Sequence, residues 1–287
     1  MEHAVLGGGG IGGLVASALA RAGADVVLLL RPQTSATYPG RLRVESAVLG
    51  GFEVEVPSAP LLEREVDVLW VATKATQLES ALTLAPAERV GGALVIPFLN
   101  GIDHVELLRS RYRRVAAGAI RVESERISPG FVRQSSPFLR AELAGADGAA
   151  AELRQAGIEC RTRDDELSLL WEKLAFLAPV ALTTTALATA LGGARADARF
   201  AGCREEALAV AEAEGARIDA PSLRALHEST SAEIRSSMQK DVAAGPEPEL
   251  DAIAGPIVRG GLRHAIPTPC TEELVQEIRP RPETLIC

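Results

Sequence analysis

The stretch VLGGGGIGG, residues 5–13, decides the fold of this chain. Because glycine loses more backbone entropy on folding than any other residue, so dense a run must serve a purpose. A short apolar run, His3 to Leu6, precedes it, and an alanine-rich amphipathic segment follows from Leu14 to Ala22. A second apolar run, DVVLLLR, covers residues 25–31. This order predicts a strand, a glycine turn, a helix and a second strand, which is the context in which GxGxxG binds a dinucleotide.

The end of the first strand sets the register of the glycines. With the first glycine directly after the strand, Gly7 makes the tight turn, Gly9 lets the backbone approach a pyrophosphate, and Gly12 allows the helix to pack on the strand. The pyrophosphate then lies at the N-terminus of the helix, where free N–H groups and the helix dipole favour an anion. The remaining glycines are incidental or help packing: Gly8, Gly10 and Gly13. The alternative is a glycine-rich loop that binds no ligand.

The end of the second strand indicates which dinucleotide binds. An NAD site usually has an acidic residue here for the ribose hydroxyls, whereas an NADP site has a cation for the 2′-phosphate. This chain has Arg31, in LLLRPQ, and no acid. Arg31 alone could be a solvated loop charge, but the missing acid independently favours NADPH over NADH.

Composition limits the class of protein and its partners. The 287 residues suit two domains, and the 47% of apolar side chains is ample for two cores. A net charge of −8 gives no general attraction to nucleic acid or to an acidic membrane. No apolar run approaches the roughly 20 residues of a membrane span, and the N-terminus lacks the pattern of a signal peptide. We expect a cytoplasmic protein that binds a small molecule, with neither nucleic acid nor membrane as a partner.

The cysteines indicate no special chemistry. They lie far apart, with no CxxC pair, at Cys160, Cys203, Cys270 and Cys287. This spacing is typical of neither a zinc site nor a disulfide framework. We therefore expect no metal, and reduced thiols with structural roles.

The first half of the chain alternates strand-like and helical segments. Strand-like runs occupy residues 41–46, 52–57, 67–73, 92–100 and 114–123, helical ones 77–85 and 104–111, and late strands and a helix 131–136 and 147–160. This alternation predicts a doubly wound parallel sheet in an α/β, Rossmann-type domain over residues 1–163. From residue 164 leucines recur at spacings of three and four, which predicts an all-helical domain over residues 164–287.

Polar residues follow three strands of the predicted sheet, at the edge where open α/β sheets bind ligands. They are Arg31, Lys74 and Gln77 in VATKATQ, and Asn100 in FLNG. In the second half, Lys173 lies in the apolar segment LSLLWEKLAFLAP. Because a lysine beside a leucine stripe usually extends its ammonium to solvent, these residues alone favour a surface position over a catalytic one.

Six motifs together resemble the ketopantoate reductase family, in order and over nearly the whole chain. They are GGGGIG, Arg31, TKATQ, LNG, WEKL and SSMQKDVAAGPEPELD. The last is the most specific, because the family's serine, methionine, aspartate, glycine and glutamate recur as Ser237, Met238, Asp241, Gly245 and Glu249. The resemblance implies an NADPH-dependent oxidoreductase that reduces 2-dehydropantoate (ketopantoate) to pantoate, a step of pantothenate biosynthesis. The oligomeric state stays open, a homodimer being one candidate.

Carried over by position, the resemblance assigns roles to individual residues. Lys173 matches the family's catalytic lysine, which acts as general acid on the keto oxygen, and Glu249 matches the glutamate near the reacting groups. Ser237 matches a substrate-binding serine, and Lys173 and Asn100 are expected to contact the substrate as well. The residues that match the cofactor side are Gly7, Gly9, Gly12, Arg31, Lys74, Gln77 and Asn100.

The chain departs from the family on the substrate side. The family carries asparagines four and eight residues after the lysine, and here these positions are Leu177 and Ala181. A site without those hydrogen bonds discriminates less well in favour of a hydroxylated substrate. Pro179 favours a kink that turns Thr183, Thr184 or Thr185 inward as a substitute. Two alternatives stay open: an NADPH oxidoreductase for a less hydroxylated 2-oxo acid or ketone, and a noncatalytic NADPH-binding protein.

Overall fold

The structure is a computed structural model that describes residues 1–279, and the chain divides into two compact units. The first unit contains Met1–Leu99 and Asp103–Leu169, and the second contains Asn100–Ile102 and the chain from Leu170 on. The division falls inside helix α7 (Glu166–Ala186), so one helix contributes to both units. The domain boundary predicted after residue 163 lies just before this helix.

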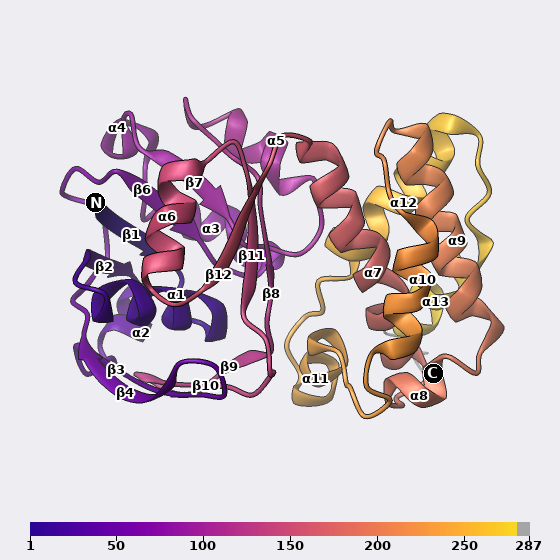
Figure 1. The fold of residues 1–287 in the computed structure, drawn as a ribbon, viewed down its shortest axis with the longest axis horizontal. Coiled ribbons are helices and arrows are strands. Elements are labelled where there is room, and N and C mark those ends of the chain that lie inside the picture. The colour runs from indigo at the N-terminus through magenta and orange to yellow at the C-terminus, as the bar shows by residue number, and fades with distance from the viewer. Residues whose placement is uncertain (280–287) are drawn as a thin grey trace, which may run out of the picture. The chain divides into compact units, whose positions relative to one another are not determined.

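A five-stranded parallel sheet forms the centre of the first unit (Figure 1). Its order is β5 (Ser58–Ala59), β2 (Asp25–Leu29), β1 (Glu2–Leu6), β6 (Val68–Val71) and β7 (Leu94–Pro97), with every neighbouring pair parallel. Because side chains alternate along a strand, Val5 enters one hydrophobic core while Ala4 and Leu6 enter another. The sheet is therefore covered on both faces, which confirms the predicted Rossmann-type α/β fold.

Helices cover the two faces separately. The core that contains Val5 also receives α1 (Gly10–Arg21) and α6 (Asp147–Gln155). The core on the other face receives α3 (Leu78–Leu82), α4 (Ala87–Val90) and α5 (His104–Arg109). Two short segments follow strand ends: α2 (Pro32–Ser35) after β2, and the 3-10 turn η1 (Ala75–Gln77) after β6.

Not all predicted strands join the parallel sheet. Strands β3 (Arg41–Ser46) and β4 (Gly50–Glu55) form an antiparallel hairpin in a four-stranded sheet of order β4-β3-β10-β9, with β9 at Ser124–Ser128 and β10 at Phe131–Gln134. A third sheet has the order β12-β11-β8, with β8 at Gly118–Arg121, β11 at Arg140–Ala144 and β12 at Glu159–Arg163. Burial alternates along β3, which is typical of a sheet with one solvated face.

The second unit is helical, as predicted. After α7 it contains α8 (Leu191–Ala194), α9 (Ala198–Ala213), α10 (Ala220–Ser229), α11 (Ser237–Ala244), α12 (Leu250–His264) and α13 (Pro269–Ile278). Figure 1 shows α9, α12 and α13 packed together. Their common core includes the buried residues Trp171, Ile257 and Leu274.

Helix α7 corrects one expectation from the sequence. It has 21 residues and a mean hydropathy of 1.3 in its most apolar window, so in length and composition it could cross a membrane. However, 72% of that window is buried within the protein, which is typical of a core helix. The expectation that no segment approaches the length of a membrane span was therefore wrong, and packing explains why so apolar a helix occurs here.

The cysteines within residues 1–279 are unpaired thiols. Burial raises the pKa of Cys160 to about 11 and that of Cys203 to about 12. Burial and neighbouring carboxylates also raise the pKa of Cys270. These thiols stay protonated near neutral pH and are poor nucleophiles, in keeping with structural roles. Cys287 lies outside the described residues.

Candidate functional site

The glycine run forms the turn between β1 and α1. Gly7 has φ of +105°, a conformation that favours glycine, and a Cβ on Gly12 would clash with the carbonyl oxygen of Gly7. In contrast, no heavy atom lies within 4 Å of the place where a Cβ on Gly9 would stand. Gly9 caps α1 without any side-chain hydrogen bond. The backbone around Gly9 is therefore open to an anion at the start of the helix, as a bound pyrophosphate requires.

The helix begins earlier than the sequence predicted, at Gly10 rather than Leu14. A Cβ on Gly10 would clash with the carbonyl group of Ser124, and one on Gly13 would lie 2.7 Å from Val132 Cγ2. Both contacts come from strands of the four-stranded sheet. Close packing against this sheet, which outweighs the low helix propensity of glycine, explains why the additional glycines lie inside the first turn of α1.

The predicted cofactor residues of the first unit lie at one edge of the parallel sheet. Arg31 follows β2 and caps α2, and its side chain is exposed. Lys74 is half-buried and precedes η1, while Gln77 ends that turn and is exposed. Because β2 and β6 flank β1 in parallel, their carboxyl ends bring these residues to the same edge as the glycine turn.

Asn100 belongs to the helical unit rather than to the glycine turn. Its Nδ2 donates a hydrogen bond of 3.1 Å to Oε2 of Glu249. The next residue, Gly101, has φ of +83°, and a Cβ there would clash with the carbonyl oxygen of Ala252 in the first turn of α12. Glu249 is buried and caps α12. The LNG turn and the last motif therefore meet at one hydrogen bond.

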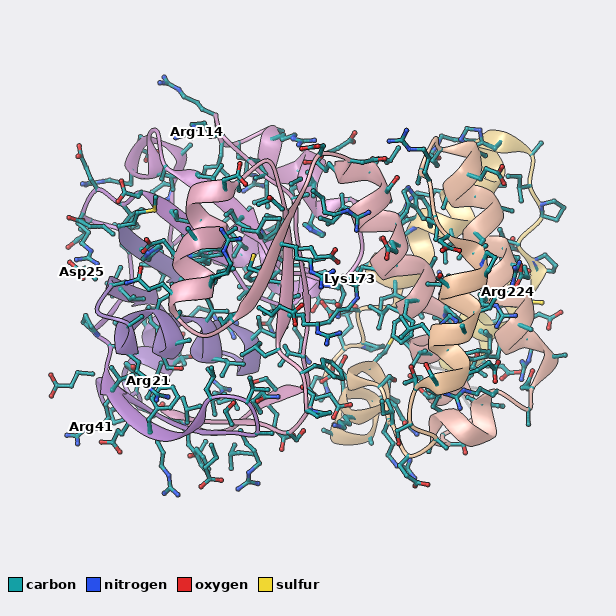
Figure 2. The ribbon with its side chains drawn as sticks, viewed as in Figure 1. Arg21, Asp25, Arg41, Arg114, Lys173 and Arg224 are labelled. Atoms are coloured by element: carbon teal, nitrogen blue, oxygen red, sulfur yellow. The ribbon has the colours of Figure 1, made fainter. Side chains whose placement is uncertain are left out.

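Lys173 extends from α7 (Figure 2) and is only 9% exposed, so the surface position favoured by its immediate neighbours is wrong. Leu177 lies one turn later and is half-buried, and Ala181 is buried one turn beyond it. Residues at this spacing share one face of a helix. The face that begins at Lys173 is therefore apolar for two turns, as expected from the sequence.

The hydroxyls of Thr184 and Thr185, beyond Pro179, bond the backbone of their own helix. Helix α7 continues through Pro179 to Ala186. Thr184 donates to the carbonyl oxygen of Val180 at 2.7 Å, and Thr185 donates to that of Ala181 at 2.6 Å. All three threonines are buried, and within the described chain Thr183 Oγ1 has no hydrogen-bond partner. Thr184 and Thr185 therefore do not present the free hydroxyls that the expected kink would turn inward.

Ser236 and Ser237 differ in their surroundings. The predicted substrate-binding residue Ser237 is exposed in the first turn of α11. Ser236, which the sequence analysis did not single out, is buried, caps α11 by accepting from Gln239 N at 3.1 Å, and lies 2.8 Å from Thr184 Oγ1. The spacing S-x-x-Q is a capping-box pattern, so the sequence did carry a signal for Ser236.

His227 on α10 is a second residue that the sequence analysis missed. It is fully buried, and its ring stacks on Phe176 at a centroid distance of 4.7 Å. Its Nε2 lies 2.9 Å from the carbonyl oxygen of Phe176. Burial lowers the pKa of His227, so the ring is neutral at pH 7 and its Nε2–H donates to that carbonyl. His227 therefore holds α10 to the part of α7 that carries Lys173 and Leu177.

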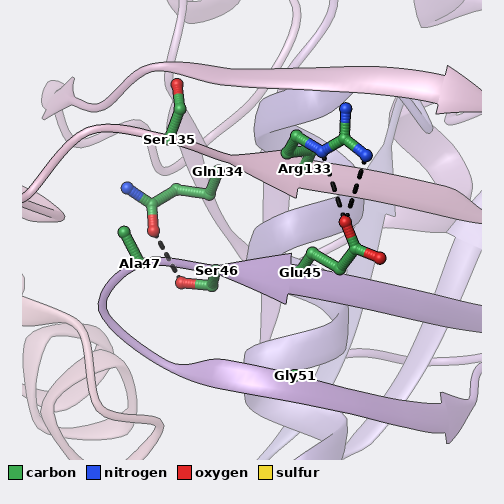
Figure 3. Close-up of a pocket in the computed structure, with 7 residues that line it drawn as sticks. All are labelled: Glu45, Ser46, Ala47, Gly51, Arg133, Gln134 and Ser135. Carbon is green, nitrogen blue, oxygen red and sulfur yellow. Dashed lines mark hydrogen bonds and ion pairs between the residues drawn. The ribbon is translucent and has the colours of Figure 1, made fainter.

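A shallow hollow of about 340 Å³ lies elsewhere, on the four-stranded sheet (Figure 3). Gln134 Oε1 accepts from Ser46 Oγ at 2.6 Å, and Arg133 pairs with Glu45 at 3.1 Å. Its polar groups thus bind one another, and none of the predicted site residues lines it. The predicted site residues lie instead at the sheet edge and on the helical unit.

Comparison with known proteins identifies similar sequences over most of the chain. The family described as Ketopantoate reductase PanE/ApbA matches residues 3–141, and that described as Ketopantoate reductase PanE/ApbA C terminal matches residues 166–281. A curated relative from Mycobacterium tuberculosis (strain CDC 1551 / Oshkosh), named 2-dehydropantoate 2-reductase, is 30% identical over 292 residues, which cover 95% of each chain.

Solved structures resemble the chain over almost its full length. A PanE/ApbA family ketopantoate reductase from Ralstonia eutropha JMP134 is 29% identical, with a TM-score of 0.86 and coverage of 97% of both chains. The ternary structure of D-mandelate dehydrogenase with NADH and anilino(oxo)acetate has the same TM-score and coverage at 23% identity. At that identity the second likeness is one of fold.

Proposed function

Because this chain belongs to the ketopantoate reductase family, and is thus an oxidoreductase acting on a keto group, we propose that it uses NADPH to reduce 2-dehydropantoate to pantoate. The observation that carries the proposal is the hydrogen bond from Asn100 Nδ2 to Glu249 Oε2. It joins two of the motifs by which the sequence resembles the family, in the same unit as the buried Lys173.

The residues at the sheet edge fit a nicotinamide dinucleotide. The open backbone at Gly9 and the start of α1, where no side chain bonds the first N–H groups, suit its pyrophosphate. The exposed guanidinium of Arg31 suits the 2′-phosphate, which supports NADPH over NADH, and Lys74 and Gln77 complete this edge. The chemistry that the bound group supplies is a hydride for the keto carbon of the substrate.

Lys173 is the general acid in this proposal. Its ammonium donates a hydrogen bond to the keto oxygen and transfers a proton to it as negative charge develops there. Because Lys173 is buried, few water molecules weaken this interaction, so it stabilises the transition state more than it would in water. Glu249, which accepts a hydrogen bond from Asn100 in the same unit, orients Lys173 in this proposal. Ser237 contributes a hydroxyl to the substrate.

A second candidate function rests on the apolar face of α7. Ketopantoate carries a hydroxyl that its analogue 3,3-dimethyl-2-oxobutanoate lacks, and Leu177 and Ala181 can form no hydrogen bond to it. This favours a 2-oxo acid with an apolar side chain as an alternative substrate. The fold is compatible with such substrates, since it is shared by a D-mandelate dehydrogenase. A noncatalytic NADPH-binding protein is the remaining alternative.

The first experiment is NADPH consumption with ketopantoate, for the wild-type protein and for Lys173→Ala. We expect turnover by the wild type and a kcat lower by about a hundredfold or more in the variant, which is the usual contribution of a positioned acid. NADPH binding to Lys173→Ala, measured by fluorescence, should be unchanged. Lys240→Ala is the matched control, because Lys240 is exposed on α11 of the same unit.

The outcomes separate the three candidate functions. Turnover of 3,3-dimethyl-2-oxobutanoate with little turnover of ketopantoate would support the alternative substrate class. NADPH binding with no turnover of either acid would support a noncatalytic protein. Equal kcat for Lys173→Ala and the wild type would remove Lys173 from the role of general acid. Sedimentation of the same samples tests whether the protein forms a homodimer, the oligomeric state that the sequence left as a candidate.

A further inference from the structure

Strand β9 lies against the glycine turn. Ser124, its first residue, donates a hydrogen bond of 2.9 Å from Oγ to the carbonyl oxygen of Gly10. The absence of a side chain on Gly10 permits this approach, since a Cβ there would clash with the Ser124 carbonyl group. β9 is also the edge strand of its sheet. The start of α1 and the start of β9 are therefore fixed side by side.

Arg126 projects from β9 toward the same region as Ser124. Side chains two residues apart on a strand point to the same face. A narrow hollow confirms this direction, because Arg126 lines it together with Gly8 of the glycine turn and Thr34 of α2. Thr34 is in the turn that Arg31 caps, with Thr34 N donating to the Arg31 carbonyl at 2.9 Å. Arg126 thus lies beside the region that the proposed cofactor occupies.

The two arginines of this region are not paired with carboxylates of the described residues. Neither Arg31 nor Arg126 makes an ion pair or a side-chain hydrogen bond with any of residues 1–279, and both side chains are exposed. Other arginines of the four-stranded sheet do find carboxylates: Arg41 pairs with Glu53, and Arg43 and Arg133 pair with Glu45. A planar guanidinium without a carboxylate is well suited to a phosphate group, which it can bind through two hydrogen bonds.

From this geometry we infer that Arg126 is a second cation for the adenosine 2′-phosphate of NADPH, opposite Arg31, and so determines specificity for NADPH over NADH. The inference rests on the proposed function. It adds a residue that lies outside both the GxGxxG motif and the strand that ends near Arg31. Two cations supplied by different sheets would hold the phosphate from two sides. Discrimination against NADH, which lacks this group, should then exceed what Arg31 alone provides.

Dissociation constants for NADPH and NADH, measured by fluorescence titration of the full chain without substrate, test the inference. Arg126→Gln should weaken NADPH binding by about tenfold, the usual effect of losing one charge-assisted hydrogen bond, and leave NADH binding within about twofold. Arg113→Gln is the matched control, because Arg113 is an exposed arginine of the same unit. It removes the same charge and should change neither constant. The fragment 2′,5′-ADP should lose affinity in parallel with NADPH.

Three results would overturn the inference, and they differ from one another. If the wild type prefers NADPH and Arg126→Gln leaves the NADPH dissociation constant unchanged, Arg126 does not bind the 2′-phosphate. The proposal that NADPH is the cofactor then still stands. Equal weakening of NADPH and NADH assigns the arginine to a group that both cofactors share. A wild type that prefers NADH overturns the proposed cofactor before any variant is compared. Thermal melting of each variant without ligand checks that the fold is retained.

Discussion

At the scale of single residues, the side chains that follow Lys173 along α7 bear on the choice of substrate. Leu177 and Ala181 occupy the positions at which the resemblance predicts asparagine, and both belong to the apolar face. We expect Leu177→Asn to shift the ratio of kcat/KM for ketopantoate over 3,3-dimethyl-2-oxobutanoate by up to about tenfold in favour of ketopantoate. One new hydrogen bond to the substrate hydroxyl would account for this shift.

The control for this prediction lies on the same helix. Leu167→Asn makes the same chemical change at a leucine that is exposed, so it should leave the ratio unchanged. A steady-state assay of both acids gives the two values of kcat/KM. If Leu177→Asn lowers both values equally, the side chain acts on packing and not on the choice of substrate.

The buried His227 makes the stability of the protein depend on pH. Burial lowers its pKa below the ordinary value near 6.5. Below pH 6.5 the unfolded chain therefore gains a proton at this residue before the folded chain does, and the free energy of unfolding falls. The stabilisation that the neutral His227 ring contributes is complete above pH 6.5. As the pH falls from 6.5 toward the lowered pKa of the folded chain, this contribution to the free energy of unfolding is lost at no more than about 1.4 kcal/mol per pH unit.

Urea unfolding at pH 7.5 and at pH 5.5 checks the sign of this effect. The free energy of unfolding of His227→Gln should be lower at pH 7.5, because packing with Phe176 is lost. Its further decrease at pH 5.5 should be smaller than that of the wild type. Equal decreases for both proteins would mean that other groups control the acid response.

At the scale of elements, the turn between β7 and α5 is tightly constrained at Gly101. Gly101 combines a φ of +83° with an approach to the Ala252 carbonyl that leaves no room for a Cβ. Gly101→Ala should therefore lower the free energy of unfolding by about 2 kcal/mol through backbone strain and overpacking. It should also lower kcat, because Asn100 can no longer remain at hydrogen-bond distance from Glu249. Gly92→Ala, at an exposed glycine with no heavy atom within 4 Å of the added Cβ, should change neither.

The strands show which elements a sequence can predict. Buried runs such as VVLL in β2 and VLWV in β6 indicate a parallel sheet covered on both faces, and they form one. RLRVES alternates instead, which is typical of a sheet with one solvated face, and Arg41–Ser46 accordingly pairs in an antiparallel hairpin. Both kinds of strand were predicted for one parallel sheet, although the period of the pattern distinguishes them.

The residues of the candidate site also differ in how well the sequence alone predicts them. The glycine turn and the position of Arg31 could be predicted because both depend on local backbone geometry at one strand end. Burial of Lys173 could not be derived from its neighbours in sequence, since it depends on what packs against α7 from distant segments. The pairing of Asn100 with Glu249 is likewise a contact between residues far apart in the chain.

At the scale of the whole molecule, one continuous helix belongs to both compact units, because the division at Leu169 and Leu170 falls within α7. A helix is a cooperative element, so partial unfolding at its middle would cost hydrogen bonds on both sides. The residues proposed for the dinucleotide lie in the first unit, except for Asn100, and the proposed general acid lies in the second. We therefore expect the two units to unfold together, and a ligand of the first unit to stabilise both.

The two tryptophans of the chain make this prediction testable, because Trp70 lies in the first unit and Trp171 in the second, both buried. Trp171→Phe leaves fluorescence from the first unit, and Trp70→Phe leaves fluorescence from the second. In urea, each variant should give the midpoint that far-ultraviolet circular dichroism gives for the same variant. NADPH at 100 times its dissociation constant should raise the free energy of unfolding by about 2.7 kcal/mol in both. If NADPH moves only the midpoint reported by Trp70, α7 does not couple the units, and two-state unfolding of the whole chain is excluded.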